Sequence, residues 1–277
     1  MQTGKASQPL IAIVTGASRG LGQALASILL GCDFIVVCAQ RTPSKLAHRH
    51  VNARDAYLDL GDLQIIEQFS QRMRDELPYV DVLINNAAIC PEDSGMQDGP
   101  PPWREVLNVN FFSQVEVTEG LMPLLESSPR HPRVINISSG DGELVFFSPE
   151  VQDLLRKVPK RRSVSHLRSV VSELLSESLE RDQLSDQEHV YHVQPAYRLS
   201  KAALNAYTRT AAKRARICNS NVCFLSVCPG DIDTEMGDPH AVQVAPEEAA
   251  REMGYLLKVA QVCDTDKFLR HGQHLAW

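Results

Sequence analysis

The sequence has no long hydrophobic run and no cysteine pair of the C-x-x-C type. No stretch approaches the roughly eighteen apolar residues that a membrane-spanning helix needs, and the N-terminal residues contain no apolar segment of the kind found in secretion signals. The seven cysteines are odd in number, and most lie in apolar runs, where a thiol packs as a small hydrophobic group. We therefore expect a soluble, cytoplasmic protein with reduced cysteines and no membrane association.

Clusters that would bind a metal or a nucleic acid are also missing from the sequence. The nine histidines are scattered, and none forms a ligand pair with a cysteine at the spacing of zinc sites, so we expect no metal site. The net charge of −6 disfavours nucleic acid as a partner. There is no repeat of fixed period and no low-complexity linker, and 277 residues suit one large α/β domain or two small ones.

What the sequence does contain is an alternation of short apolar runs with longer amphipathic segments. Runs rich in Val and Ile are typical of buried strands, and they lie at 10–15, 34–39, 80–85, 134–138 and 222–228. Helical periodicity lies between them at 20–30, 63–77, 103–125 and 196–218. This order predicts an α/β fold over residues 1–277, a single doubly wound parallel-sheet domain of the Rossmann type with helices on both faces.

One polar, helix-prone segment at about 148–194 interrupts this alternation. Pro159 and the basic run Lys160-Arg161-Arg162 divide it into two parts. We expect a helical insertion that packs on the domain surface, with the basic run as a solvated turn or, alternatively, as an anion or partner site. The second part of the insertion carries one apolar stripe at helical spacing, formed by Leu167, Val170, Val171, Leu174, Leu175 and Leu179.

A glycine-rich loop, Thr15-Gly16-Ala17-Ser18-Arg19-Gly20-Leu21-Gly22, lies between the first predicted strand and the first predicted helix. A strand, a tight turn and a helix N-terminus together direct backbone N–H groups and the positive end of a helix dipole at a pyrophosphate. Glycine is required where φ is positive or where a side chain would block the ligand. The loop predicts a dinucleotide site, although taken alone it is also compatible with a purely structural turn.

Tyr197 and Lys201 lie four residues apart in one predicted helix, hence on the same face and one turn from each other. A tyrosine with an ordinary pKa of about 10 exchanges protons poorly at neutral pH. The ammonium of Lys201, together with an oxidised nicotinamide, would lower that pKa. The pair is therefore a candidate for proton transfer to a carbonyl oxygen, whereas the same spacing by itself occurs in many helices by chance.

Six motifs in this order resemble the short-chain dehydrogenase/reductase family. They are T-G-x-x-x-G-x-G at 15–22, Asn85-Asn86-Ala87-Ala88, Asn110, Ser139, Tyr197-x-x-x-Lys201, and Pro229-Gly230 followed by Thr234. Only Ala88 departs from the family pattern, which has glycine there. The resemblance implies that Ser139, rather than Ser138, binds the substrate oxygen. It further implies that Lys201 also holds the nicotinamide ribose and that Asn110 holds a water linking Lys201 to solvent.

The resemblance also implies a cofactor site that is selective for NADPH. NAD-binding members usually carry an acidic residue at the end of the second strand, which here ends in Gln40-Arg41. Arg19 and Arg41 occupy positions where NADPH-selective members bind the 2′-phosphate, and the alternative is that both are surface arginines. Asp59 would meet the adenine, and Asn86 and Ala87 its ribose. The remaining implied cofactor positions are Gly16, Ser18, Gly20, Leu21, Gly22, Leu60, Tyr197, Lys201, Pro229, Gly230, Ile232 and Thr234.

The long segment between Ser139 and Tyr197 resembles the monomeric carbonyl reductase subgroup of this family. The resemblance implies reduction of small carbonyl compounds such as quinones, aldehydes and ketones, by a monomer whose insertion covers the helices through which tetrameric relatives pair. Further matches to the subgroup lie at 110–112, at 148–150, at 229–236 and at Trp277. The implied substrate-pocket residues are Gly140, Asp141, Asp231 and Met236.

Asp141 and Asp231 stand where relatives of this subgroup carry bulky apolar side chains, which makes a strongly apolar quinone pocket less well supported. The competing interpretation of the chain is a catalytically silent NADPH-binding sensor or scaffold. Such a protein would have no need of Asn110, Ser139, Tyr197 and Lys201 together. The sequence therefore favours an enzyme.

Overall fold

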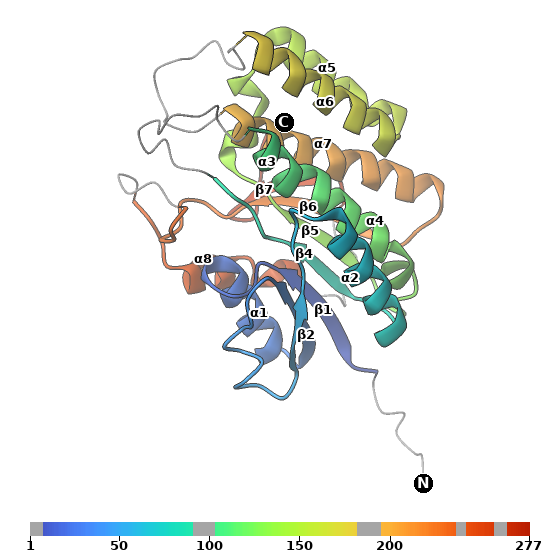
Figure 1. The fold of residues 1–277 in the computed structure, drawn as a ribbon, viewed down its shortest axis with the longest axis vertical. Helices are drawn as coiled ribbons and strands as arrows, with labels where there is room; N and C mark the ends of the chain where they lie inside the picture. Colours follow the sequence, from blue (N-terminus) through green and yellow to red (C-terminus); the bar gives the residue numbers. More distant parts are fainter. Residues whose placement is uncertain (1–7, 91–102, 182–194, 237–241, 258–264) are drawn as a thin grey trace.

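The computed structural model describes residues 8–90, 103–181, 195–236, 242–257 and 265–277 and contains one eight-stranded sheet (Figure 1). The strand order is β3-β2-β1-β4-β5-β6-β7-β8, in which β1 to β7 are parallel and β8 is antiparallel to β7. The strands are β1 (Leu10–Thr15), β2 (Phe34–Gln40), β3 (Ala53–Tyr57), β4 (Val82–Asn85), β5 (Arg133–Ile137), β6 (Cys223–Cys228), β7 (Lys267–Arg270) and β8 (Gln273–His274).

Helices cover both faces of this sheet (Figure 1). On one face lie α1 (Gly20–Gly31) and α8 (Pro246–Glu252), and on the other lie α2 (Leu63–Glu76), α3 (Trp103–Leu107), α4 (Ser113–Glu126) and α7 (Pro195–Ile217). The predicted doubly wound parallel sheet is confirmed. In the described part of the chain, no helix combines the length and the apolar character that crossing a membrane requires.

The structure differs from the predicted element ranges at β3 and in the helix at 103–125. The strand β3 was not predicted because Arg54, Asp55 and Tyr57 interrupt its apolar character, as is common at a sheet edge. The predicted helix 103–125 is α3 and α4 joined by a π-helix, Asn108–Phe112, so the helical segment continues through a locally wider turn.

The segment after β5 forms α5 (Pro149–Arg161) and α6 (Val164–Arg181), which pack on the outer side of α7 (Figure 1). The two helices are separated at the end of the basic run: α5 continues through Pro159 to Arg161 and ends where Arg162 adopts a left-handed φ of 58°. The exposed basic run lies at the C-terminal end of α5, where positive charge is favourable to the helix dipole.

The apolar stripe of α6 is buried in the same core as the inner face of α7. Its described members are Leu167, Val170, Val171, Leu174 and Leu175. The side chain of Leu179 and residues 182–194 of the predicted insertion lie outside the described part of the structure.

Candidate active site

The glycine loop joins the carboxyl end of β1 to the N-terminus of α1. Gly16 and Gly20 adopt positive φ values of 66° and 56°, which glycine alone adopts without strain. A Cβ atom on Gly22 would lie 2.3 Å from the carbonyl oxygen of Gly16, so a side chain at position 22 is excluded. The N-cap residue Arg19 makes no side-chain hydrogen bond to the helix, so the first turn of α1 has no side-chain cap at the position where a pyrophosphate is expected. Within the loop, Ser18 is half-buried and Leu21 is buried.

Side chains after β4 hold this loop in shape. The hydroxyl oxygen of Thr15 accepts hydrogen bonds from the backbone N–H groups of Asn86 and Ala87, at 2.9 and 3.1 Å. The amide nitrogen of Asn86 donates to the carbonyl oxygen of Thr15 at 3.0 Å, and the side chain of Gln114 donates to the carbonyl oxygen of Ala87 at 2.5 Å. The sequence pattern indicates Asn86 and Ala87 but not the bracing by Thr15 and Gln114, since neither spacing nor residue type marks it.

The residues predicted to meet the adenosine part of the cofactor lie at neighbouring strand ends. Arg41 follows β2 and is exposed, and Arg19 forms an exposed ion pair with Glu235 that the sequence did not predict. Asp59 is half-buried and accepts a hydrogen bond from the backbone of Gly61 at 2.9 Å, which fixes the turn after β3. Leu60 is buried, and its carbonyl oxygen accepts a hydrogen bond from Ser113.

The segment after β6 lies opposite the glycine loop. Gly230, after Pro229, has a φ of 80°, and Ile232 is buried and forms an isolated parallel bridge with Val244. The methyl group of Thr234 would lie 3.3 Å from a Cβ atom on Gly20, which shows how closely the two segments approach. Asp231 lies 3.9 Å from a guanidinium nitrogen of Arg270, and Met236 is exposed.

Tyr197, Lys201 and Ser139 come together where β5 ends beside α7. The ammonium of Lys201 donates to the carbonyl oxygen of Ile137 at 2.9 Å and lies 5.3 Å from the centre of the Tyr197 ring. Ser139 follows β5 beside this pair, and its hydroxyl donates to the carboxylate of Asp141 at 2.8 Å. The hydroxyl of Ser138 points instead to the backbone oxygen of Lys201, so Ser139 is the serine that faces the tyrosine.

Burial dominates the electrostatics of this cluster. It raises the pKa of Tyr197 well above its ordinary value, with smaller contributions in the same direction from Cys90 and Asp141, while the nearby polar side chain of Ser139 acts in the opposite direction. Burial also lowers the pKa of Lys201 to about 8. In the protein without cofactor, desolvation is the largest effect on the pKa of Tyr197, and the lowering expected from Lys201 together with an oxidised nicotinamide stays a prediction.

Asn110 lies in the π-helix and clamps the backbone of Ile89. Its side-chain oxygen accepts from the N–H of Ile89, and its amide nitrogen donates to the carbonyl oxygen of the same residue, both at 2.8 Å. The amide nitrogen also reaches the hydroxyl of Ser200 at 3.3 Å, next to Lys201 in the chain. The described contacts of Asn110 are therefore structural ones at the edge of the Lys201 site.

The segment after Ser139 is fixed to α7. The hydroxyl of Ser139 donates to the carboxylate of Asp141 at 2.8 Å, across the half-buried Gly140. A Cβ atom on Gly142 would lie 2.8 Å from the backbone carbon of Lys201, and the carbonyl oxygen of Gly142 accepts from the indole of Trp277 at 2.9 Å. The sequence placed Asp141 near the pocket but did not reveal its bond to Ser139.

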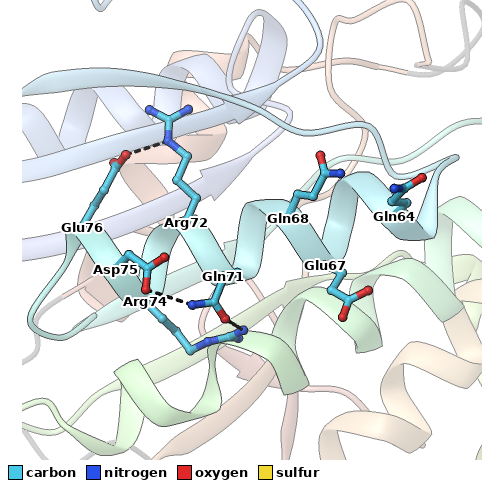
Figure 2. Close-up of a pocket in the computed structure, with 8 residues that line it drawn as sticks. All are labelled: Gln64, Glu67, Gln68, Gln71, Arg72, Arg74, Asp75 and Glu76. Carbon is cyan, nitrogen blue, oxygen red and sulfur yellow. Dashed lines mark hydrogen bonds and ion pairs between the residues drawn. The ribbon is translucent and has the colours of Figure 1, made fainter.

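A separate hollow runs along the polar surface of α2 (Figure 2). Its lining side chains all come from this one helix, between Gln64 and Glu76, and they bond to one another, as in the ion pair of Arg72 with Glu76. None of them belongs to the predicted site. The candidate site is therefore the cluster at the carboxyl ends of β1, β4, β5 and β6, the position where open parallel sheets bind ligands.

Comparisons with known proteins relate this site to a family. Residues 10–149 match the family model of the short chain dehydrogenases. Carbonyl reductase [NADPH] 1 of Sus scrofa is 27% identical over 268 residues, which cover 90% of this chain and 87% of that protein. (+)-Neomenthol dehydrogenase of Arabidopsis thaliana is 24% identical over 271 residues, which cover 87% of this chain and 89% of that protein.

Solved structures have the same fold. Salutaridine reductase from Papaver somniferum is 23% identical with a TM-score of 0.75, over 94% of this chain and 99% of that chain. NADPH-bound carbonyl reductase from chicken fatty liver is 23% identical with a TM-score of 0.71, over 98% of this chain and 100% of that chain. Since the family match spans just over half of the sequence, the chain belongs to the short-chain dehydrogenase/reductase family of oxidoreductases and resembles its carbonyl reductases.

Proposed function

We propose that this protein reduces small carbonyl compounds, namely aldehydes, ketones and quinones, to alcohols with NADPH. The observation that carries the proposal is the convergence of Ser139, Tyr197 and Lys201 at the end of β5, where Lys201 and Tyr197 are buried and Ser139 is half-buried. The similarity to proteins named carbonyl reductase [NADPH] 1 supports the same reaction.

The glycine loop fits the pyrophosphate of a dinucleotide. Its positive φ values, the excluded side chain at Gly22 and the uncapped N-terminus of α1 together form a surface of backbone N–H groups. Arg19 and Arg41 would bind the 2′-phosphate, and Lys201 would hold the nicotinamide ribose. Bound NADPH supplies the hydride that is added to the carbonyl carbon.

Tyr197 is the proton donor in this proposal. Because burial raises the pKa of its hydroxyl, the phenol keeps its proton at neutral pH, which is the state that reduction requires. The ammonium of Lys201 near the ring stabilises the negative charge that develops on the tyrosine as the proton leaves. Ser139, which lies beside Tyr197 at the end of β5, orients the carbonyl oxygen.

The direct test is an assay of NADPH oxidation with a panel of quinones, aldehydes and diketones. We expect steady turnover with at least one class, dependent on both protein and substrate. The purified protein should also bind NADPH in a fluorescence titration. Binding of NADPH without turnover on any member of the panel would contradict the proposal and favour the binding-protein interpretation.

Replacing both Arg19 and Arg41 with glutamine should weaken NADPH binding by at least about tenfold and leave NADH binding almost unchanged. The reason is that only NADPH has the 2′-phosphate. When NADPH binds, the guanidinium of Arg19 would leave its exposed partner Glu235 and pair with this phosphate. The dissociation constants of both cofactors should be measured by fluorescence titration. A matched control replaces Arg161 and Arg162, which are exposed at the end of α5. Equal losses of affinity for NADPH and NADH would show that the two arginines do not bind the 2′-phosphate.

The position of α6 leads us to propose a monomer of 30.7 kDa. The apolar stripe of α6 is buried against α7, and Arg168 on α6 forms an ion pair with Glu116 on α4 and lies 5.7 Å from the ring centre of Phe112. An isologous interface through α4 and α7 needs the same patch free on both subunits, and α6 occupies part of it. Light scattering of the purified protein tests this, and a stable tetramer at micromolar concentration would contradict it.

A further inference from the structure

We propose that Asp141 determines substrate specificity: its carboxylate binds the ammonium group of amino ketones, compounds in which an ammonium stands next to the carbonyl group. The inference rests on the proposed reductase function and adds a substrate class to it. It is carried by the hydrogen bonding of Ser139, by the available second oxygen of Asp141 and by the fixed position of the segment that holds both residues.

The hydroxyl of Ser139 has one proton, and that proton is directed at Asp141. The Oγ atom of Ser139 lies 2.8 Å from Oδ2 of Asp141 and accepts a hydrogen bond from the backbone N–H of the same residue at 3.2 Å. A hydroxyl that donates to a carboxylate cannot donate at the same moment to a substrate carbonyl oxygen. Ser139 is therefore released for the substrate only when Asp141 receives another donor.

An ammonium on the substrate supplies that donor. Among the described residues, none donates a hydrogen bond to Oδ1 of Asp141, and no cationic side chain forms an ion pair with this carboxylate. An ammonium has three N–H donors and a full positive charge, so it satisfies the carboxylate while the serine proton turns to the carbonyl oxygen. A neutral ketone has no donor that could replace the Ser139 hydroxyl at the carboxylate of Asp141.

The second acidic residue of the predicted pocket differs from Asp141 in its surroundings. The carboxylate of Asp231 lies 3.9 Å from a guanidinium nitrogen of Arg270, which offsets its charge, and its side chain is 56% exposed. Asp141 is half-buried and adds its negative field to both Tyr197 and Lys201. The acid available to a substrate beside the proton donor is therefore Asp141.

The backbone that carries Asp141 is fixed relative to Tyr197. Gly142 packs so closely on α7 that a Cβ atom there would lie 2.8 Å from the backbone carbon of Lys201. The indole of Trp277 donates to the carbonyl oxygen of Gly142 at 2.9 Å, and Asn205 donates to the same oxygen at 3.4 Å. A carboxylate held at a fixed distance from the proton donor selects the position of the ammonium as well as its charge.

The test uses α-aminoacetophenone (2-amino-1-phenylethanone) and propiophenone, which have nearly the same shape but differ in the ammonium group. Their dissociation constants are measured by calorimetry on the full chain saturated with NADP⁺, where no reduction takes place. Their kcat/KM values are then measured with NADPH. The variants are Asp141→Asn and Asp141→Leu, with Glu67→Gln on the exposed surface of α2 as a control that changes the net charge in the same way as Asp141→Asn.

We expect the preference for the amino ketone over propiophenone to fall by at least about tenfold in both Asp141 variants, in binding and in kcat/KM, and to stay within about twofold in the control. In Asp141→Leu, kcat/KM for propiophenone should also rise, because Ser139 is released. Ratios are compared between variants because the ammonium also activates the carbonyl group chemically. NADPH affinity that matches the wild type shows that each variant is folded.

A wild type that binds the two ketones equally, or an Asp141→Asn variant that keeps the wild-type ratio, would overturn the inference. Turnover with an unchanged ratio overturns the role of Asp141 and leaves the reductase function intact. A shifted binding ratio without turnover of any carbonyl compound supports the role of Asp141 and overturns the reductase function.

Discussion

Replacing Tyr197 with phenylalanine should lower kcat by about 10²- to 10⁴-fold, the usual contribution of a positioned proton donor. The substitution removes one oxygen atom and keeps the ring that packs under Lys201, so the fold and the NADPH affinity should hardly change. The loss should fall on kcat rather than on KM, because the proton is transferred in the transition state. Steady-state kinetics with the best carbonyl substrate of the panel measure this directly.

Tyr207→Phe is the matched control for this variant. Tyr207 is a second buried tyrosine on α7, and its hydroxyl donates to Glu119 at 2.8 Å rather than facing the candidate site. Its replacement removes the same atom from the same helix, and we expect turnover close to that of the wild type. Near-normal turnover in Tyr197→Phe would exclude this residue as the proton donor.

Replacing Lys201 with methionine should lower kcat/KM by at least about 10²-fold and change how stability depends on pH. Burial lowers the pKa of Lys201 from the ordinary 10.5 to about 8. Below pH 8 the lysine is charged in both the folded and the unfolded state, so the folded protein bears the whole cost of the buried ammonium, about 3 kcal/mol. Between pH 8 and 10.5 only the unfolded state holds the proton, and this cost disappears as the pH rises.

The free energy of unfolding of the wild type should therefore rise relative to that of Lys201→Met by up to about 3 kcal/mol between pH 7 and pH 10.5. The comparison between the two proteins cancels every other titrating group and the constant loss of the hydrogen bond to Ile137. Urea unfolding at several pH values measures it. Lys157→Met, at an exposed lysine of α5, should show no such trend, and a pH-independent difference for Lys201 would contradict a buried ammonium.

The central strands could be predicted from the sequence because they are buried on both faces. The strands β1, β2, β4, β5 and β6 are rich in apolar residues, and each was predicted. The edge and near-edge strands β3, β7 and β8 carry charged or exposed residues such as Arg54 and Lys267, and their short runs show no apolar pattern. Hydrophobic periodicity indicates which residues are buried. Strands with charged or solvent-exposed residues are therefore not recognised from it.

The positions of the candidate site residues followed from motif order, but their interactions did not. Spacing along one helix places Tyr197 and Lys201 on one face, as the structure has them. It does not give the desolvation that raises the pKa of Tyr197, because burial depends on elements far away in the sequence. The ion pair of Arg19 with Glu235 and the bond of Ser139 to Asp141 likewise depend on side-chain directions that no periodicity encodes.

The bracing of the glycine loop by Thr15 and Asn86 has a consequence for the kinetics of cofactor binding. Ordering a backbone residue costs about 1–2 kcal/mol in conformational entropy, and here that cost is incurred when the chain folds rather than when the dinucleotide arrives. Because the loop is already ordered, less of the free energy of the contacts with the cofactor is lost to ordering the protein. A fragment that carries only the pyrophosphate and adenosine should therefore still bind through the contacts of those two groups. Association then depends on diffusion and on the charges at the loop, and the residence time of the cofactor is governed by how many contacts must break together.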